Sequence, residues 1–438
     1  MASIAETTIF CKGNCKFDFS GGNLSSDSGL LLVGEFMESI GLFDMLNHAF
    51  DDETAAFKQH SAGSVVAQKI LQTIAGYGAD RHAKFLASDP VFPKALGKRR
   101  IASQPTMSRT LRNTGLLSED SLNGILRQLR RAAYRIQCPK DVVFDIDTTI
   151  LQTYGKQEGA EYIHHYGEVG YHPHLCYDGN TGDLLRVSLR KGASYCGKDA
   201  DHFLKPLLDE YTLRYPRTSL FVRGDSGFAM PELYELVEHY PKSRYAIRLK
   251  ENSVLAKNAE ETSAKVMEEH AEVPDRLHEA FGEFQYRAGT WNKARRVIFK
   301  VEHRPDELFP RKTFIVTNME RTPKEMIEFY CKRGNMENFI KESKNDFGFS
   351  HMSSREMDVN KNRLSVAAIA YAVFNLFRRL CLPQEWKCLR ASGIRLCLLK
   401  VASRVSRHAR ELKFHLCSSY PFQEEFMSIH RHILQWIT

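Results

Sequence analysis

Residues 330–344, YCKRGNMENFIKESK, constrain this chain more than any other stretch because they repeat charged side chains at helical spacing. Five polar residues are spaced 3, 4, 4 and 3 apart, which predicts a helix with all five on one face. These five are Tyr330, Arg333, Glu337, Lys341 and Lys344. The helix is then expected to dock on a core through Met336, Phe339 and Ile340, which point elsewhere.

The chemistry of this polar face has two explanations. A carboxylate flanked by Arg and Lys suits a metal ion beside phosphate, since the acid binds the metal and the cations bind the phosphate oxygens. Arg–Glu and Glu–Lys pairs at helical spacing are also common on solvated helices that have no function. Two further carboxylates upstream in the sequence favour the explanation that this face binds a metal ion.

Composition excludes some classes of protein. With 438 residues, 43% of them hydrophobic, the chain can form two or three domains with sizeable cores. The net charge of +8 is compatible with a nucleic-acid partner. The ten Cys form no paired zinc pattern, which favours reduced thiols in a cytosolic protein. We expect no signal peptide and no membrane span, because charges interrupt every long apolar window.

The first part of the chain, residues 1–137, is predicted to be mostly helical with basic edges. Longer helices are expected at 30–50, 64–77, 80–88 and 119–134. A short helix capped by Ser103, with Pro105 in its first turn, carries Arg109 and Arg112. Helix–turn–helix proteins present such a helix to DNA, and a connecting helix in a helical bundle is the alternative.

A change of pattern follows in VVFDIDTTIL, which alternates as a strand does. Asp145 and Asp147 face one side, whereas Phe144 and Ile146 face the other. Two acids on an otherwise apolar strand are costly to bury without a partner, and a metal ion is the simplest one. A strand end where the acids reach water is the alternative.

A third acid, Asp225, lies just past the predicted strand Ser219–Arg223, where a helix begins near Pro231. Open α/β sheets place their sites at that end of a strand. An Asx turn or helix cap is the alternative, since Asp beside Gly is common in turns. Other strands are predicted at 171–177, 184–189 and 245–249, and a helix at 198–215.

The remainder divides into a β-rich part and a helical part. After a polar stretch, FGEFQYRAG, RRVIFKVEH and KTFIVTN predict strands within 252–320. Helices are expected to resume at 323–344 and 360–380. The segment from Arg378 to Lys413 contains ten Lys or Arg but only two Glu, which fits a basic amphipathic helix lying on DNA. A solvated cationic face on a packing helix is the alternative.

Three motifs taken together resemble the DDE transposases of bacterial insertion sequences. They are Asp147-Thr148-Thr149, Arg223-Gly224-Asp225-Ser226-Gly227, and Tyr330-x-x-Arg333-x-x-x-Glu337-x-x-x-x-x-x-Lys344. They are similar to the subgroup with a DID-[ST] strand, an R-x-DSG turn and a Y-x-K-R-G-N-x-E-N-x-I-K-E helix. SSDSGLLLVGEF, GYGADRHAKFLASDP and SQPTMSR resemble its N-terminal region, so the resemblance covers most of the chain.

This resemblance implies an α/β fold with a ribonuclease-H-like (retroviral-integrase-like) catalytic core over residues 138–380. Residues 252–320 would be a β-rich insertion in that core. A helical DNA-binding domain would occupy residues 1–137, and a helical basic region residues 381–438.

The resemblance also implies a metal site. Asp147, Asp225 and Glu337 would be the catalytic acids and would hold two Mg²⁺ ions, for which Mn²⁺ can substitute. Such an ion pair activates water or a 3′-hydroxyl and stabilises the leaving oxygen of an in-line displacement at phosphorus. Asp145 is a further possible ligand, although the family's acid precedes a hydroxyl residue, as Asp147 precedes Thr148.

By the same resemblance, Tyr330, Arg333 and Lys344 would contact DNA phosphates, together with Lys341 on the same face. Trp291 would stack on a flipped base, and packing within a β hairpin is the alternative. Four histidines do not close a zinc site and are expected at the surface or near DNA. They are His164, His165, His172 and His174.

The implied function is transposition of an insertion sequence by cleavage at its terminal inverted repeats and strand transfer into target DNA. Pairing two DNA ends implies at least a homodimer in the synaptic complex. The expected location is the bacterial cytoplasm, at the nucleoid. Two alternatives stay open: an inactive or domesticated DNA-binding protein on the same fold, and a metal-dependent nuclease without strand transfer.

Overall fold

The computed structural model describes residues 7–11, 13–50, 59–409 and 411–435. The chain forms two compact units: unit 1 comprises residues 1–117 and 369–438, and unit 2 comprises residues 118–368. These limits differ from the predicted boundaries after residues 137 and 380. The helix α7 (Glu119–Ile136) belongs to unit 2 because it packs against the strand β9 (Leu184–Ser188) of the sheet there.

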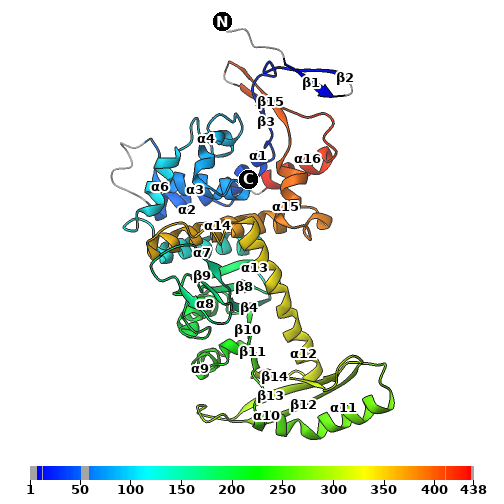
Figure 1. Ribbon diagram of the computed structural model, residues 1–438. Coiled ribbons are helices and arrows are strands. Elements are labelled where there is room, and N and C mark those ends of the chain that lie inside the picture. The colour runs from blue at the N-terminus through cyan, green and yellow to red at the C-terminus, as the bar shows by residue number, and fades with distance from the viewer. Residues whose placement is uncertain (1–6, 12, 51–58, 410, 436–438) are drawn as a thin grey trace. The chain divides into compact units, whose positions relative to one another are not determined.

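Unit 2 is organised around an eight-stranded mixed sheet with the order β12-β13-β14-β11-β10-β4-β8-β9 (Figure 1). Besides β9, its strands are β4 Asp141–Thr148, β8 His174–Asp178, β10 Ser219–Gly224, β11 Ser243–Leu249, β12 His278–Tyr286, β13 Arg295–His303 and β14 Arg311–Thr317. The strand β10 runs parallel to both β4 and β11. All other neighbours in this sheet are antiparallel.

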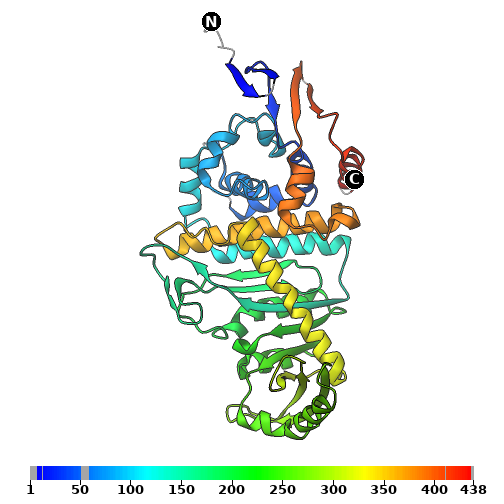
Figure 2. The same cartoon turned by 45° about the vertical axis from the view of Figure 1, so that its right-hand side comes forward.

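Helices cover both faces of this sheet because β4 alternates its side chains. Val143 clusters with buried residues of α12 (Pro323–Cys331). On the opposite face, the ring of Phe144 lies 5.2 Å from that of Tyr211 in α8 (Ala200–Arg214). Figure 2 shows α12 passing across the sheet, in yellow.

The β-rich segment predicted at 252–320 is partly helical, and its strands extend the main sheet. Its polar stretch forms α10 (Ser253–Asn258) and α11 (Glu260–Glu272). Its strands β12, β13 and β14 form an antiparallel ladder, and β14 pairs with β11. Unit 2 also contains α9 Pro231–His239 and a small sheet of β5 Leu151–Gln152, β6 Glu161–Ile163 and β7 Glu168–Tyr171.

The helix predicted over residues 330–344 is present but is not regular along its length. The segment comprises the end of α12, a 3₁₀ turn at Lys332–Gly334, and a separate helix α13 (Asn335–Asp346). Glycine is a poor helix former, and Gly334 lies where the regular hydrogen-bond ladder is interrupted. Side chains before and after this turn therefore do not share one straight helical face.

Unit 1 is mostly helical. Its helices include α1 Leu30–Ser39, α2 Leu42–Ala49, α3 Ala62–Ile74, α4 Ala83–Leu86, α5 Phe92–Ala95, α6 Gln104–Arg112, α15 Ala391–Ile394 and α16 Gln423–Leu434. The helix predicted at 30–50 is two helices because Gly41 adopts a φ of 73°, which ends α1 and starts α2. Among the described residues, β1 Thr7–Cys11 and β2 Gly13–Phe17 form a hairpin.

The C-terminal basic region is not wholly helical, contrary to the prediction. Its strands β15 (Ser403–His408) and β16 (Glu411–Leu416) pair antiparallel, and β15 also pairs with the short strand β3 (Leu24–Ser25). Side chains on β15 alternate, with Val405 buried and Arg404 exposed. A period of two, rather than 3.6, therefore governs this part of the tail.

One helix in the part of the chain described, α14 (Met357–Cys381), is long and apolar enough to span a membrane. Its most apolar window is 83% buried inside the protein, as in the core helix of a folded domain.

Candidate active site

Two of the predicted acids lie side by side at the carboxyl ends of neighbouring strands. In the parallel ladder between β4 and β10, Asp145 is the register partner of Arg223. Asp147 and Asp225 each follow two residues later, so the chain brings both acids to the same edge of the sheet. Asp147 lies within β4, and Asp225 caps a short 3₁₀ turn after β10.

The acid pair lies in a partly desolvated position. Burial raises the pKa of Asp147 to about 6, an effect that Arg333 opposes and that the negative charge of Asp225 reinforces. One oxygen of each carboxylate accepts a backbone hydrogen bond, at 2.8 Å from Thr148 N to Asp147 and 2.8 Å from Gly227 N to Asp225. Two adjacent carboxylates with oxygens to spare favour a cation between them.

A protein cation already lies against this pair. The Nη2 of Arg333, from the 3₁₀ turn after α12, is 2.8 Å from Oδ2 of Asp147, and both side chains are mostly buried. Tyr330 donates a hydrogen bond of 3.3 Å to the carbonyl of Gly224, and burial raises its pKa to about 12. The structure thus brings Tyr330 and Arg333 to the acids.

The rest of the polar segment is directed elsewhere. Glu337 has a side chain that is 64% exposed and lies 3.9 Å from the Nζ of Lys341. Lys344 donates a 2.9 Å hydrogen bond to the carbonyl of Ile150. Among the described residues, no three His, Cys, Asp or Glu are grouped to hold a metal ion. The oxygen donors of Asp147 and Asp225 suit a hard divalent cation, and Glu337 is not gathered with them.

Asp145 has a different partner. Its side chain is fully buried, and its two oxygens accept hydrogen bonds of 2.6 Å from Nε and Nη2 of Arg223. Arg223 also donates to the carbonyl of Phe329 at 2.6 Å, which ties β10 to α12. A Cβ at Gly179 would lie 2.3 Å from both partners, so this close turn requires glycine. Asp145 therefore serves the packing of the core, with both of its oxygens paired to Arg223.

Other predicted residues have mixed placements. Trp291 is 5% exposed and packs edge-on against Tyr234, with ring centroids 5.4 Å apart, so it is a packing residue here. Arg109 and Arg112 are exposed on α6. His164 and His165 are exposed, but His172 and His174 are buried, so the expected surface position is wrong for the latter two. Each buried histidine ring makes a hydrogen bond to a backbone carbonyl, His172 with Ser194 and His174 with Cys196.

Sequence patterns missed two neighbours of the acid pair. Burial raises the pKa of Tyr166 to about 12, and the charges of Asp147 and Asp225 add to this rise. Cys196 accepts a 3.6 Å hydrogen bond from the hydroxyl of Thr148, directly after Asp147. Both lie in turns without periodicity, so no local signal marked them.

Comparison with known proteins identifies the family. No curated protein matches the chain. Among solved structures, the chain is similar to a piggyBac transposase in a synaptic complex with hairpin DNA, at 12% identity and a TM-score of 0.37, over 86% of this chain and 80% of that one. The family described as "Transposase DDE domain group 1" matches residues 9–437, almost the whole chain. The chain therefore belongs to this family of DDE transposases.

Proposed function

We propose that this protein is the transposase of a bacterial insertion sequence, which cleaves DNA at the terminal inverted repeats and joins the 3′ ends to target DNA. The observation that carries the proposal is the adjacency of Asp147 and Asp225 in a chain of the DDE transposase family. Hydrolysis and strand transfer need the same site, because water and a 3′-hydroxyl are alternative nucleophiles at one phosphorus.

The large mixed sheet is consistent with a ribonuclease-H-like transposase fold, in which β9, β8, β4, β10 and β11 are consecutive. We propose that residues 252–320 are an insertion into this core. The helical N-terminal part and the basic C-terminal region would then bind DNA. The protein would act in the bacterial cytoplasm, as a homodimer when two ends are paired.

The proposed site uses Asp147, Asp225 and Glu337 to hold two Mg²⁺ or Mn²⁺ ions. The ions would activate the nucleophile and stabilise the leaving oxygen. Arg333 would leave Asp147 and pair with the scissile phosphodiester, for which a guanidinium is well suited. Glu337 is assigned from its motif, and rearrangement of the 3₁₀ turn at Lys332–Gly334 would carry it toward the two aspartates.

The test is Mg²⁺-dependent cleavage of a labelled duplex that ends in the element's own terminal repeat. We expect wild type to nick at the repeat boundary. Asp147→Asn and Glu337→Gln should bind the duplex normally but cleave at least about 100-fold more slowly, since they remove metal ligands. The matched control is Glu328→Gln, which neutralises an exposed glutamate on α12 and should cleave like wild type.

Two results would replace the proposal. Binding without cleavage by wild type, in Mg²⁺ and in Mn²⁺, would favour the DNA-binding alternative. Cleavage without joining of the 3′ ends to a second duplex would favour the nuclease.

A further inference from the structure

The net positive charge of this protein belongs to one of its two units. Of the 61 Lys and Arg, 23 lie in unit 1, together with 15 of the 53 Asp and Glu. This leaves 38 of each in unit 2, which is therefore neutral, so the whole net charge of +8 belongs to unit 1. Unit 1 is the part that attracts a polyanion by its charge alone.

Within unit 1, two adjoining hollows gather several of these cations. The first has a volume of about 450 Å³ and is lined by the start of α3 and by α6, through His60, Ala62, Thr106, Arg109, Thr110 and Asn113. The second has a volume of about 500 Å³ and is lined by Gln59, His60, Lys98, Arg99 and Arg100. They share Gln59 and His60, and we call them the paired hollows.

The cations of the paired hollows lack acidic partners in the described part of the chain. Among the residues that the structure describes, no Asp or Glu lines either hollow. Burial lowers the pKa of the Lys98 ammonium, and burial together with Lys98 lowers the pKa of His60. A partly buried ammonium without a counter-charge is destabilising, so an anion bound beside Lys98 would relieve that cost.

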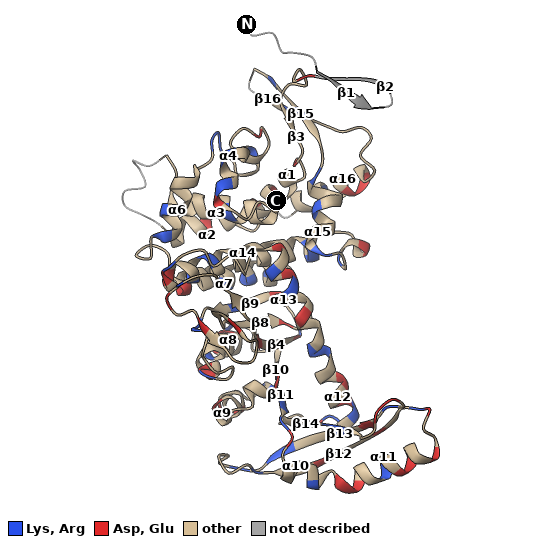
Figure 3. Ribbon diagram, viewed as in Figure 1, with Lys and Arg blue, Asp and Glu red and all other residues tan. Residues whose placement is uncertain are grey.

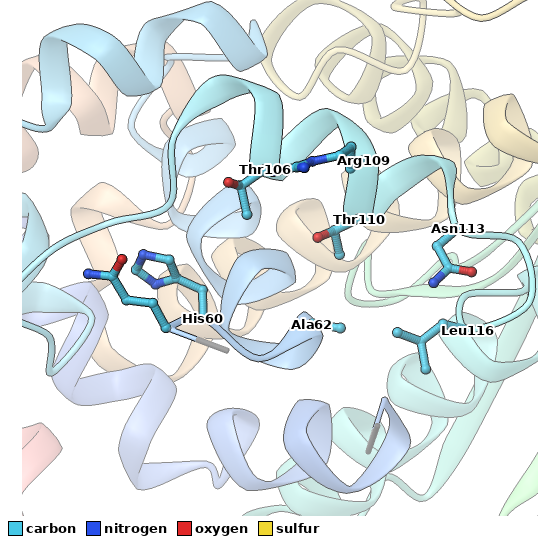
Figure 4. Close-up of a pocket in the computed structure, with 8 residues that line it drawn as sticks. His60, Ala62, Thr106, Arg109, Thr110, Asn113 and Leu116 are labelled. Carbon is cyan, nitrogen blue, oxygen red and sulfur yellow. The ribbon is translucent and has the colours of Figure 1, made fainter. Parts of the chain in front are cut away.

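Three other lining groups of the first hollow are hydrogen-bond donors suited to phosphate. Figure 4 shows Thr106, Thr110 and Asn113 along one side of the first hollow, with His60 and Ala62 opposite. Basic residues lie on and beside α6 in Figure 3. Hydroxyl, amide and guanidinium groups make most protein contacts with DNA phosphates. Two adjoining hollows, one lined by Arg109 and the other by three cations, suit a chain of phosphates better than a single small anion.

The backbone that holds these donors is rigid. On α6, Met107 is fully buried and clusters with Val65 of α3 and with Ala102. The opposite face of α6, with Arg109, is exposed. The donors are thus presented from a packed helix, which lowers the entropic cost of binding.

We propose that the paired hollows bind the sugar–phosphate backbone of duplex DNA, at a site in unit 1, whereas the catalytic acids lie in unit 2. This inference rests on the proposed function for its choice of ligand. Because the contacts are to phosphates, binding there is independent of base sequence.

The test uses the full chain and a labelled duplex of mixed sequence, with a chelator present, and measures anisotropy over a series of salt concentrations. Arg100→Ala with Arg109→Ala removes one cation from each hollow. We expect binding to weaken about tenfold at low salt, and the slope of log K against log[salt] to fall by about 2. The matched control, Arg81→Ala with Lys84→Ala, removes two exposed cations on and beside α4 and should change neither quantity appreciably.

The inference would be overturned if both double variants lost the same amount of DNA affinity, or if the Arg100/Arg109 variant lost none. If the alanine variant unfolds at a lower temperature, Arg100→Gln with Arg109→Gln replaces it and the same slopes apply. The two proposals can fail separately. If the Arg100/Arg109 variant shows the expected fall in slope but wild type does not cleave, only the transposase proposal is contradicted. If wild type cleaves but the slope of that variant is unchanged, only the proposed role of the paired hollows is contradicted.

Discussion

Asp145 and Asp147 are two positions apart on one face of β4, yet their partners give them opposite roles. Asp145 is sealed against Arg223, with both carboxylate oxygens occupied. Asp147 lies at the strand end, beside Asp225, with only Arg333 against its outer oxygen. Sequence alone left the choice of ligand open because alternation places both acids on the same side.

These roles predict that neutralising each aspartate by mutation to asparagine changes the free energy of unfolding by a different amount. Asp145→Asn leaves a buried guanidinium without its counter-charge, which should lower the free energy of unfolding by about 3–5 kcal/mol. Asp147→Asn loses one ion pair but also the repulsion from Asp225, so we expect a change below about 1 kcal/mol. Urea denaturation of both variants measures this difference, and equal losses would contradict the assignment.

A second buried acid makes stability depend on pH. Burial raises the pKa of Asp178 to about 6, although it accepts hydrogen bonds from Val143 N, Asn180 N and the Thr181 hydroxyl. Since this pKa exceeds the ordinary value of about 3.9, the folded state holds the proton more tightly than the unfolded state. The stabilisation is complete below about pH 4 and is lost as the pH rises through 6.

Asp178→Asn should therefore flatten the decline in melting temperature between about pH 4 and pH 6. It should not abolish the decline, because the pKa of Asp147 is raised to a similar value. Each of the two carboxyl groups can change the free energy of unfolding by at most about 3 kcal/mol over this pH range. Asp141→Asn, at the exposed start of β4, is the control, and an identical change in both variants would refute the explanation.

At the scale of elements, local pattern predicted the strands of the core well, because alternation and apolar runs are local properties. The order of the strands was not predictable, since the pairing of β4 with β10 joins residues far apart in the chain. For the site, the motifs predicted Asp147 and Asp225, which this pairing brings together. They did not predict the turn that directs Glu337 to solvent, nor Tyr166 and Cys196, which reach the acids only by tertiary packing.

The turn between α12 and α13 is open to a direct test. Gly334 has helical angles, φ −55° and ψ −23°, and an added Cβ would meet nothing within 4 Å. Gly334→Ala should stabilise the fold by about 0.5–1 kcal/mol, because alanine loses less backbone entropy. At Gly182, φ is 72° and a Cβ would lie 2.8 Å from the ring of Phe339, so Gly182→Ala should destabilise by more than about 1 kcal/mol. Thermal unfolding measures the change in stability of both variants, and changes of the same sign would contradict these predictions.

For the whole molecule, the net charge and the acid pair belong to different units. The acids lie in a neutral unit, and the net charge lies in the other, which combines both ends of the chain. An electrically neutral unit gains little from long-range attraction to DNA. The affinity of the full chain for duplex DNA should then depend on the cations of unit 1 that contact phosphates, and not on the cations of unit 2.

The exposed arginines of β15 test this division outside the paired hollows. Arg404 and Arg407 lie on a strand of the C-terminal region, in unit 1, and both are exposed. Replacing both with alanine should lower the salt slope of duplex binding by up to about 2, because DNA releases about one counterion fewer for each phosphate that the protein no longer neutralises. Arg214→Ala with Arg217→Ala removes the same charge from the exposed end of α8 in unit 2 and should leave the slope unchanged. Equal slopes in the two double variants would mean that DNA binds to both units alike, and the net charge of unit 1 would then not decide where DNA binds.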